Sequence, residues 1–78
     1  MRIYRAYITE TENHKTGKDT FTMFFHGSYS YYNSLLECYK ELDERMPGSE
    51  LYISLKQLVI TAKREYKYES EYTIRTAA

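Results

Sequence analysis

The sequence has no tryptophan, one cysteine, one proline and three glycines, and neither sign of charge is in excess. Its lone cysteine, Cys38, cannot form a disulfide within the chain, which favours a reducing compartment. Eleven basic residues balance eleven acidic ones, and this balance argues against strong nonspecific binding to nucleic acid. No apolar run approaches the roughly 20 residues of a membrane span, so we expect a soluble, cytoplasmic protein without a membrane partner.

Residue patterns that support catalysis or cofactor binding are also missing. The three glycines stand too far apart for a phosphate-binding loop, and the two histidines and Cys38 lack the close-spaced pairs of a zinc site. A Cys38–His26 pair is conceivable where a strand ends beside the helix, but the acidic neighbours of Cys38 raise the pKa of a thiol rather than lower it. We therefore expect no enzymatic activity, no metal and no cofactor.

Tyrosine is the residue that the chain has in surplus, with ten among 78 residues. A tyrosine ring buries a large area with few rotatable bonds and keeps a hydroxyl that needs a partner, which suits half-buried sheet faces and interfaces. A chain of this length forms one domain, residues 1–78, with a core of modest size. The surplus therefore indicates an interaction surface.

One amphipathic helix is predicted within residues 28–48, because only there do apolar residues recur at helical spacing. Serines near the start of this segment can cap the helix, and Ser34 with Glu37 forms a capping box that would start it later. Pro47 ends it. The predicted apolar stripe consists of Tyr32, Leu35, Leu36, Tyr39, Leu42 and Met46.

Strand-forming residues fill the chain on both sides of this helix. The predicted strands are residues 1–10, 20–26, 51–62 and 66–76. The apolar positions of the third strand change parity near Lys56, which predicts a bulge or a break there, and a turn without favoured turn residues follows near 62–65. This order predicts an α+β fold, ββαββ, with a four-stranded antiparallel sheet and one helix on one face. The other face stays uncovered, and aromatic residues on it would mark an interaction site.

Two surfaces are candidates for binding a partner. In the last strand, tyrosines alternate with charged residues, and rings beside cations are how proteins stack and hold single-stranded nucleic acid. Glutamates on the same strand cancel most of that positive charge, which favours an amphipathic strand whose tyrosines lie under the helix. The helix offers an acidic face. The candidate partner-binding residues are Tyr66, Tyr68, Tyr72, Glu37, Glu41 and Glu44.

Surplus tyrosine without a catalytic constellation leads us to expect a small, non-enzymatic protein-binding domain. It would act through an aromatic sheet face or the acidic helix face, with homodimerisation through the uncovered sheet as the favoured form. Compact, motif-free, tyrosine-rich chains of this size are frequent among phage and mobile-element proteins that block a host component, so inhibition of a host or defence complex is the expected role. The alternative is a single-stranded nucleic-acid-binding protein that uses the tyrosine-rich basic C-terminal strands.

Overall fold

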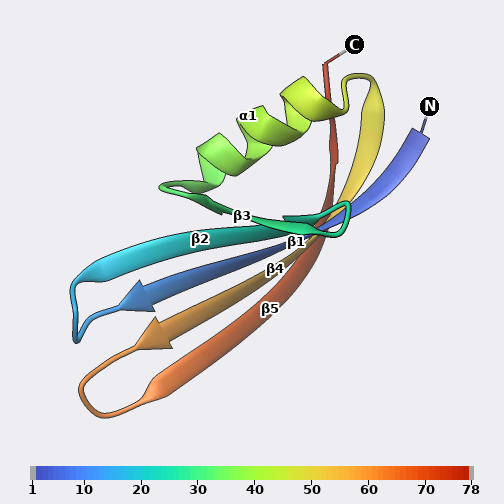
Figure 1. The fold of residues 1–78 in the computed structure, drawn as a ribbon. Coiled ribbons are helices and arrows are strands. Elements are labelled where there is room, and N and C mark those ends of the chain that lie inside the picture. Colours follow the sequence, from blue (N-terminus) through green and yellow to red (C-terminus); the bar gives the residue numbers. More distant parts are fainter. Residues whose placement is uncertain (1, 78) are drawn as a thin grey trace.

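The computed structural model describes residues 2–77, which form five strands and one helix (Figure 1). In chain order the elements are β1 (Arg2–Asn13), β2 (Lys18–Phe25), β3 (Ser28–Tyr32), α1 (Leu35–Arg45), β4 (Ser49–Ile60) and β5 (Glu65–Arg75). The strands make one sheet in the order β3-β2-β1-β4-β5, and α1 lies on one side of it. The central pair, β1 and β4, is parallel, whereas the other neighbouring pairs are antiparallel.

The predicted four-stranded antiparallel sheet, ββαββ, is wrong, although the fold is α+β. Residues Ser28–Tyr32, which the sequence assigned to the start of the helix, form a fifth strand. The physical reason is the turn at His26 and Gly27, whose φ values are 52° and 76°. Positive φ at both central residues is the requirement of a two-residue type I′ hairpin, and Phe25 accordingly pairs with Ser28.

The parallel pairing of β1 with β4 is the second feature that the predicted topology lacked. Tyr4 lies opposite Leu51 and Ile8 lies opposite Leu55 in this pair. Parallel neighbours need a long crossover connection, and here β2, β3 and α1 together supply it. The chain thus leaves the sheet at its β3 edge, passes over one face as α1, and re-enters beside β1.

β4 is one continuous strand, so the predicted bulge near Lys56 is wrong. Its register runs without interruption against both β1 and β5. Leucine and isoleucine at 51, 53 and 55 lie in the core beneath α1, whereas Leu58 and Ile60 have the other parity and lie on the opposite face. The change of parity therefore marks a strand with apolar residues on both faces.

The predicted turn after β4 is confirmed at residues 61–64, and Thr61 explains how it forms without glycine or proline. The Thr61 hydroxyl accepts hydrogen bonds from the amides of Lys63 and Arg64 at 3.3 and 3.0 Å. Its own amide donates to the carbonyl of Arg64 at 2.8 Å. A threonine side chain thus satisfies the turn backbone, as serine and threonine often do.

α1 begins at the later of the two predicted positions. Ser34 is the N-cap, its Oγ accepts from the amide of Glu37 at 3.2 Å, and the Glu37 carboxylate accepts from the amide of Asn33 at 2.8 Å. This reciprocal pair is the predicted capping box. The predicted stripe is wrong at Leu36, which is 62% exposed, while Cys38 is fully buried in its place.

The core lies between α1 and the part of the sheet beneath it. It consists of Ala6, Ile8, Met23, Phe25, Cys38, Leu42, Leu51, Ile53 and Leu55. The sheet extends well past α1, and the structure measures 46 × 20 × 19 Å along its principal axes (Figure 1). Among residues 2–77, no helix is long and apolar enough to cross a membrane. We call the sheet face opposite α1 the open face, because no element of the described residues covers it (Figure 1).

Candidate protein-binding surface

Aromatic side chains gather on the open face over β1, β2 and β3. Tyr7 lies opposite Phe24, and Phe24 lies opposite Tyr29, so the three rings share one face. Their chain neighbours Ile8 and Met23 belong to the core on the other face, which fixes the direction of the rings. The ring centres of Tyr7 and Phe24 are 6.3 Å apart, and those of Phe24 and Tyr29 are 4.7 Å apart.

Tyr31 extends this row, since it follows Tyr29 by two residues in β3 and therefore lies on the same face. We name Tyr7, Phe24, Tyr29 and Tyr31 the aromatic patch. Tyr29 is 69% exposed and Tyr31 is 80% exposed, although aromatic residues usually bury much of their area. Contiguous exposed apolar area of this kind commonly marks an interaction site.

The neighbouring part of the open face, over β4 and β5, carries paired charges beside the apolar side chains of Tyr52, Leu58 and Ile60. The Arg5 guanidinium donates to Ser54 Oγ at 3.2 Å and to Glu71 Oε1 at 3.4 Å, and it lies 5.9 Å from the centre of the Tyr52 ring. A hollow of about 480 Å³ opens beside the aromatic patch, with Lys56 among its lining residues. The open face therefore combines an aromatic half with a half on which charges of both signs are paired.

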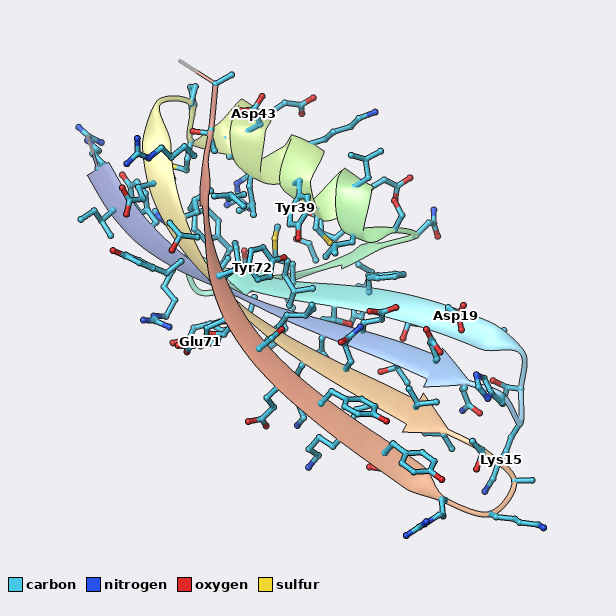
Figure 2. The ribbon with its side chains drawn as sticks, turned by 180° about the vertical axis from the view of Figure 1, so that it is seen from behind. Lys15, Asp19, Tyr39, Asp43, Glu71 and Tyr72 are labelled. Atoms are coloured by element: carbon cyan, nitrogen blue, oxygen red, sulfur yellow. The ribbon has the colours of Figure 1, made fainter. Side chains whose placement is uncertain are left out.

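Tyr72, one of the predicted partner-binding residues, lies on the opposite face beneath α1. Figure 2 shows its side chain and that of Tyr39 pointing toward each other. The two rings meet edge to face with centres 6.2 Å apart, and the two hydroxyls are in contact. Burial raises the pKa of Tyr72 above its ordinary value, and the hydrogen bond with Tyr39 adds to this rise. Tyr72 thus packs within the subunit.

Tyr66 and Tyr68 share that face but lie beyond the end of α1, where they are 39% and 56% exposed. The Arg64 guanidinium already lies 5.5 Å from the centre of the Tyr66 ring. Tyr68 lies opposite Gln57, whose amide donates to the Glu10 carboxylate at 2.8 Å. Carboxylates beside these rings repel phosphate, and the cations within β5 alternate onto the open face. Within β5 the rings and the cations thus lie on opposite faces of the sheet, whereas Arg64, just before the strand, lies beside a ring.

The acidic residues of α1 do not form a single binding surface. Glu37 is engaged in the capping box, Glu41 is half-buried and Glu44 is exposed. Arg45 does not pair with Glu41 in the structure of residues 2–77, because its guanidinium lies 5.2 Å from the centre of the Phe25 ring. The sequence predicted that these carboxylates share one exposed helix face. In the structure, the hydrogen bond of Glu37 and the partial burial of Glu41 leave Glu44 as the exposed carboxylate of the three that makes no such contact.

Cys38 and His26 offer no catalytic arrangement. Cys38 is fully buried between α1 and the sheet, and this burial raises the pKa of its thiol to about 11. Since the thiolate is the nucleophile, this raised pKa disfavours the reactive form of Cys38 at neutral pH. His26 is exposed in the hairpin turn and contacts the Phe25 ring at 4.5 Å between centres. Among residues 2–77, no three histidine, cysteine or acidic side chains are placed to hold a metal ion.

No protein-family model, curated protein or solved structure matches the chain. The function must therefore be inferred from the geometry of the surface itself.

None of the four residues of the aromatic patch was among the predicted site residues. The sequence did carry a signal for them, because the first two strands have apolar residues at both parities. Alternation of serine and tyrosine over residues 28–31 was a second signal, which the predicted helix obscured. Tyr29 and Tyr31 lie on one face of β3, whereas β2 has aromatic residues on both faces. Which of these rings lie side by side follows only from the pairing of β2 with β3.

Proposed function

We propose that this protein is a non-enzymatic protein-binding domain whose partner docks on the aromatic patch of the open face. One observation carries the proposal: four aromatic side chains lie together over three adjacent strands on a face that no element of residues 2–77 covers. Tyrosine rings supply large contact area at small entropic cost, and they are enriched at the centres of protein interfaces.

Charge supports a protein partner in preference to a phosphate backbone. The chain has no net charge, and Arg5 beside the patch is already compensated by Glu71. An aromatic centre with a paired polar border is the usual composition of a protein interface. A domain that binds without chemistry acts by occupying a surface of its partner, so we propose inhibition of a host or defence complex as its biological role.

Two matched double variants test the proposal. Tyr29→Ser/Tyr31→Ser removes exposed rings from the aromatic patch, and Tyr66→Ser/Tyr68→Ser removes two exposed rings from the opposite face. Each protein, tagged and checked for folding by circular dichroism, is incubated with a lysate of cells in which the protein acts. Captured proteins are identified by mass spectrometry, and the affinity for the captured partner is then measured.

We expect the patch variant to bind the partner at least about tenfold more weakly, because truncation of a central interface tyrosine typically costs that much. The control variant should bind as the unmodified protein does. Equal binding by both variants, or loss confined to the control, would contradict the proposal. So would an unmodified protein that is strictly monomeric by light scattering and captures nothing.

A further inference from the structure

β5 presents a free backbone edge at the border of the sheet. The amide of Thr76 donates to the carbonyl of Ser49 in β4 at 2.9 Å, so even-numbered residues of this segment direct their backbone groups toward β4. In an antiparallel ladder the alternate residues direct theirs outward. Within residues 2–77, the amides and carbonyls of Glu71, Thr73 and Arg75 therefore point away from β4 and face no other strand. The next outward amide, that of Ala77, donates to Asp43 Oδ1 at 2.6 Å and marks the end of this free edge.

This edge lacks most of the features that block strand addition. β5 is 11 residues long, contains neither proline nor glycine, and pairs with β4 without a bulge. The opposite edge, β3, is only five residues long. Charged side chains of both signs are the protective feature on β5, with Lys67 and Arg75 on either side of Glu69 and Glu71. The positions of these charges therefore determine the charge pattern and the register of any strand that can pair with this edge.

The charges of β5 complement a second copy of β5 in a narrow set of registers. Two antiparallel β5 strands that continue one sheet are related by a two-fold axis perpendicular to that sheet. With the axis at any residue from 67 to 71, at least one pair of like charges lies directly opposite, as when Glu69 meets the partner subunit's Glu69. An axis at Tyr72 places Glu69 opposite the partner subunit's Arg75 but leaves Glu71 opposite an uncharged threonine. With the axis at Thr73, Glu71 lies opposite the partner subunit's Arg75, and the reverse pair repeats it. Opposite charges facing across strands stabilise the pairing.

The same register matches apolar side chains on the α1 side of the sheet. There Tyr72 lies opposite the partner subunit's Ile74. A hollow of about 300 Å³ lies between α1 and β5, lined by Leu36, Tyr39 and Ile74 among others. Leu36 is 62% exposed on that flank of α1. In this register the partner subunit's Tyr72 and the partner subunit's Ile74 would lie on the same side of the sheet as this hollow. They would offer Leu36 an apolar contact that it does not have within one subunit.

We propose that two copies of this protein associate through their β5 edges, with the two-fold axis at Thr73 and the sheet continuing through both subunits. The proposal is independent of the aromatic patch, which lies on β1, β2 and β3. Glu71 and Arg75 are each three-quarters exposed, so both can form the new ion pairs. The contact is small, and the dimer is expected to dissociate on dilution.

Sedimentation equilibrium over a range of protein concentrations measures the dissociation constant of this dimer for the unmodified protein and for variants in which a charge is reversed. Glu71→Arg and Arg75→Glu should each weaken dimerisation about tenfold, since each places like charges opposite each other twice. The double variant Glu71→Arg/Arg75→Glu should recover most of the affinity. Within one subunit the two side chains have separate partners, Arg5 and Glu50, so recovery reports contact between subunits.

Disulfide trapping tests the register. Thr73→Cys should give a covalent dimer under mild oxidation, because the two introduced side chains meet at the axis. Lys67→Cys, on the same strand and face, is the matched control and should stay monomeric; Cys38 is buried and does not interfere. A protein that stays monomeric at all concentrations, or cross-links only through Lys67→Cys, would overturn the proposal. So would a dimer lost in Tyr29→Ser/Tyr31→Ser, because the second copy would then occupy the aromatic patch.

Discussion

Two leucines of α1 provide a quantitative test of which helix face is buried. Leu42 is fully buried within the core, whereas Leu36, also on α1, is 62% exposed. Replacement of a buried leucine by alanine removes its transfer free energy and leaves a cavity, at a cost of about 2–5 kcal/mol. Leu36→Ala keeps most of its surroundings unchanged, and we expect a cost below about 1 kcal/mol from the side-chain area that it does bury.

Urea and thermal unfolding, each followed by circular dichroism at low micromolar concentration where association does not contribute, measure both costs. A loss of about 3 kcal/mol corresponds to a fall in Tm of about 12–24 °C for a domain of this size. Leu42→Ala should show such a fall and Leu36→Ala only a few degrees. Similar losses for the two variants would mean that α1 is rotated toward the stripe predicted from sequence, and the described core would be refuted.

Three further predictions concern the cap, the β2–β3 turn and the buried thiol. Ser34→Ala should lower the free energy of unfolding by about 1 kcal/mol, because the Glu37 amide loses its acceptor, while Ser34→Asp should restore it in the same urea titration. Gly27→Ala should cost about 1–2 kcal/mol through its φ of +76° alone, since no atom lies near the added Cβ, and a smaller loss in urea would argue against this turn.

For Cys38 the folded pKa of about 11 lies above its ordinary value of 9.0, so its contribution is complete below pH 9 and is lost as pH rises to 11. This loss is at most about 2.7 kcal/mol and is measured as the difference in unfolding free energy between the unmodified protein and Cys38→Ala across that range, because the raised pKa of Tyr72 acts in both proteins.

Local features of the fold were predictable from the sequence because their causes are local. The capping box at Ser34 and Glu37, the end of the helix before Pro47 and the alternation of β5 each follow from neighbouring residues. Hairpin formation at His26 and Gly27 is a different case, since positive φ is uncommon for any non-glycine residue and the turn lacks the Asn-Gly or Asp-Gly pair that marks such hairpins. The strand that follows was therefore assigned to the helix, and the fifth strand was missed.

The site depended on information that a single segment does not contain. Tyr7, Phe24 and Tyr29 lie far apart in the sequence, and only the β1–β2 and β2–β3 registers bring them together. The prediction that an uncovered face would carry aromatic residues is confirmed, since Tyr7, Phe24 and Tyr29 lie on the open face. The candidate Tyr72 lies on the other face, under α1 and against Tyr39, as the amphipathic interpretation of the last strand predicted.

Photo-cross-linking tests the central claim most directly, because it reports which face touches a partner. A benzophenone amino acid is introduced in place of Tyr31 on the aromatic patch and, separately, in place of Tyr66 on the opposite face. Both positions are exposed and lie on edge strands of the sheet. We predict a covalent product with one partner protein from position 31 and none from position 66. Cross-linking from position 66 alone would contradict the account.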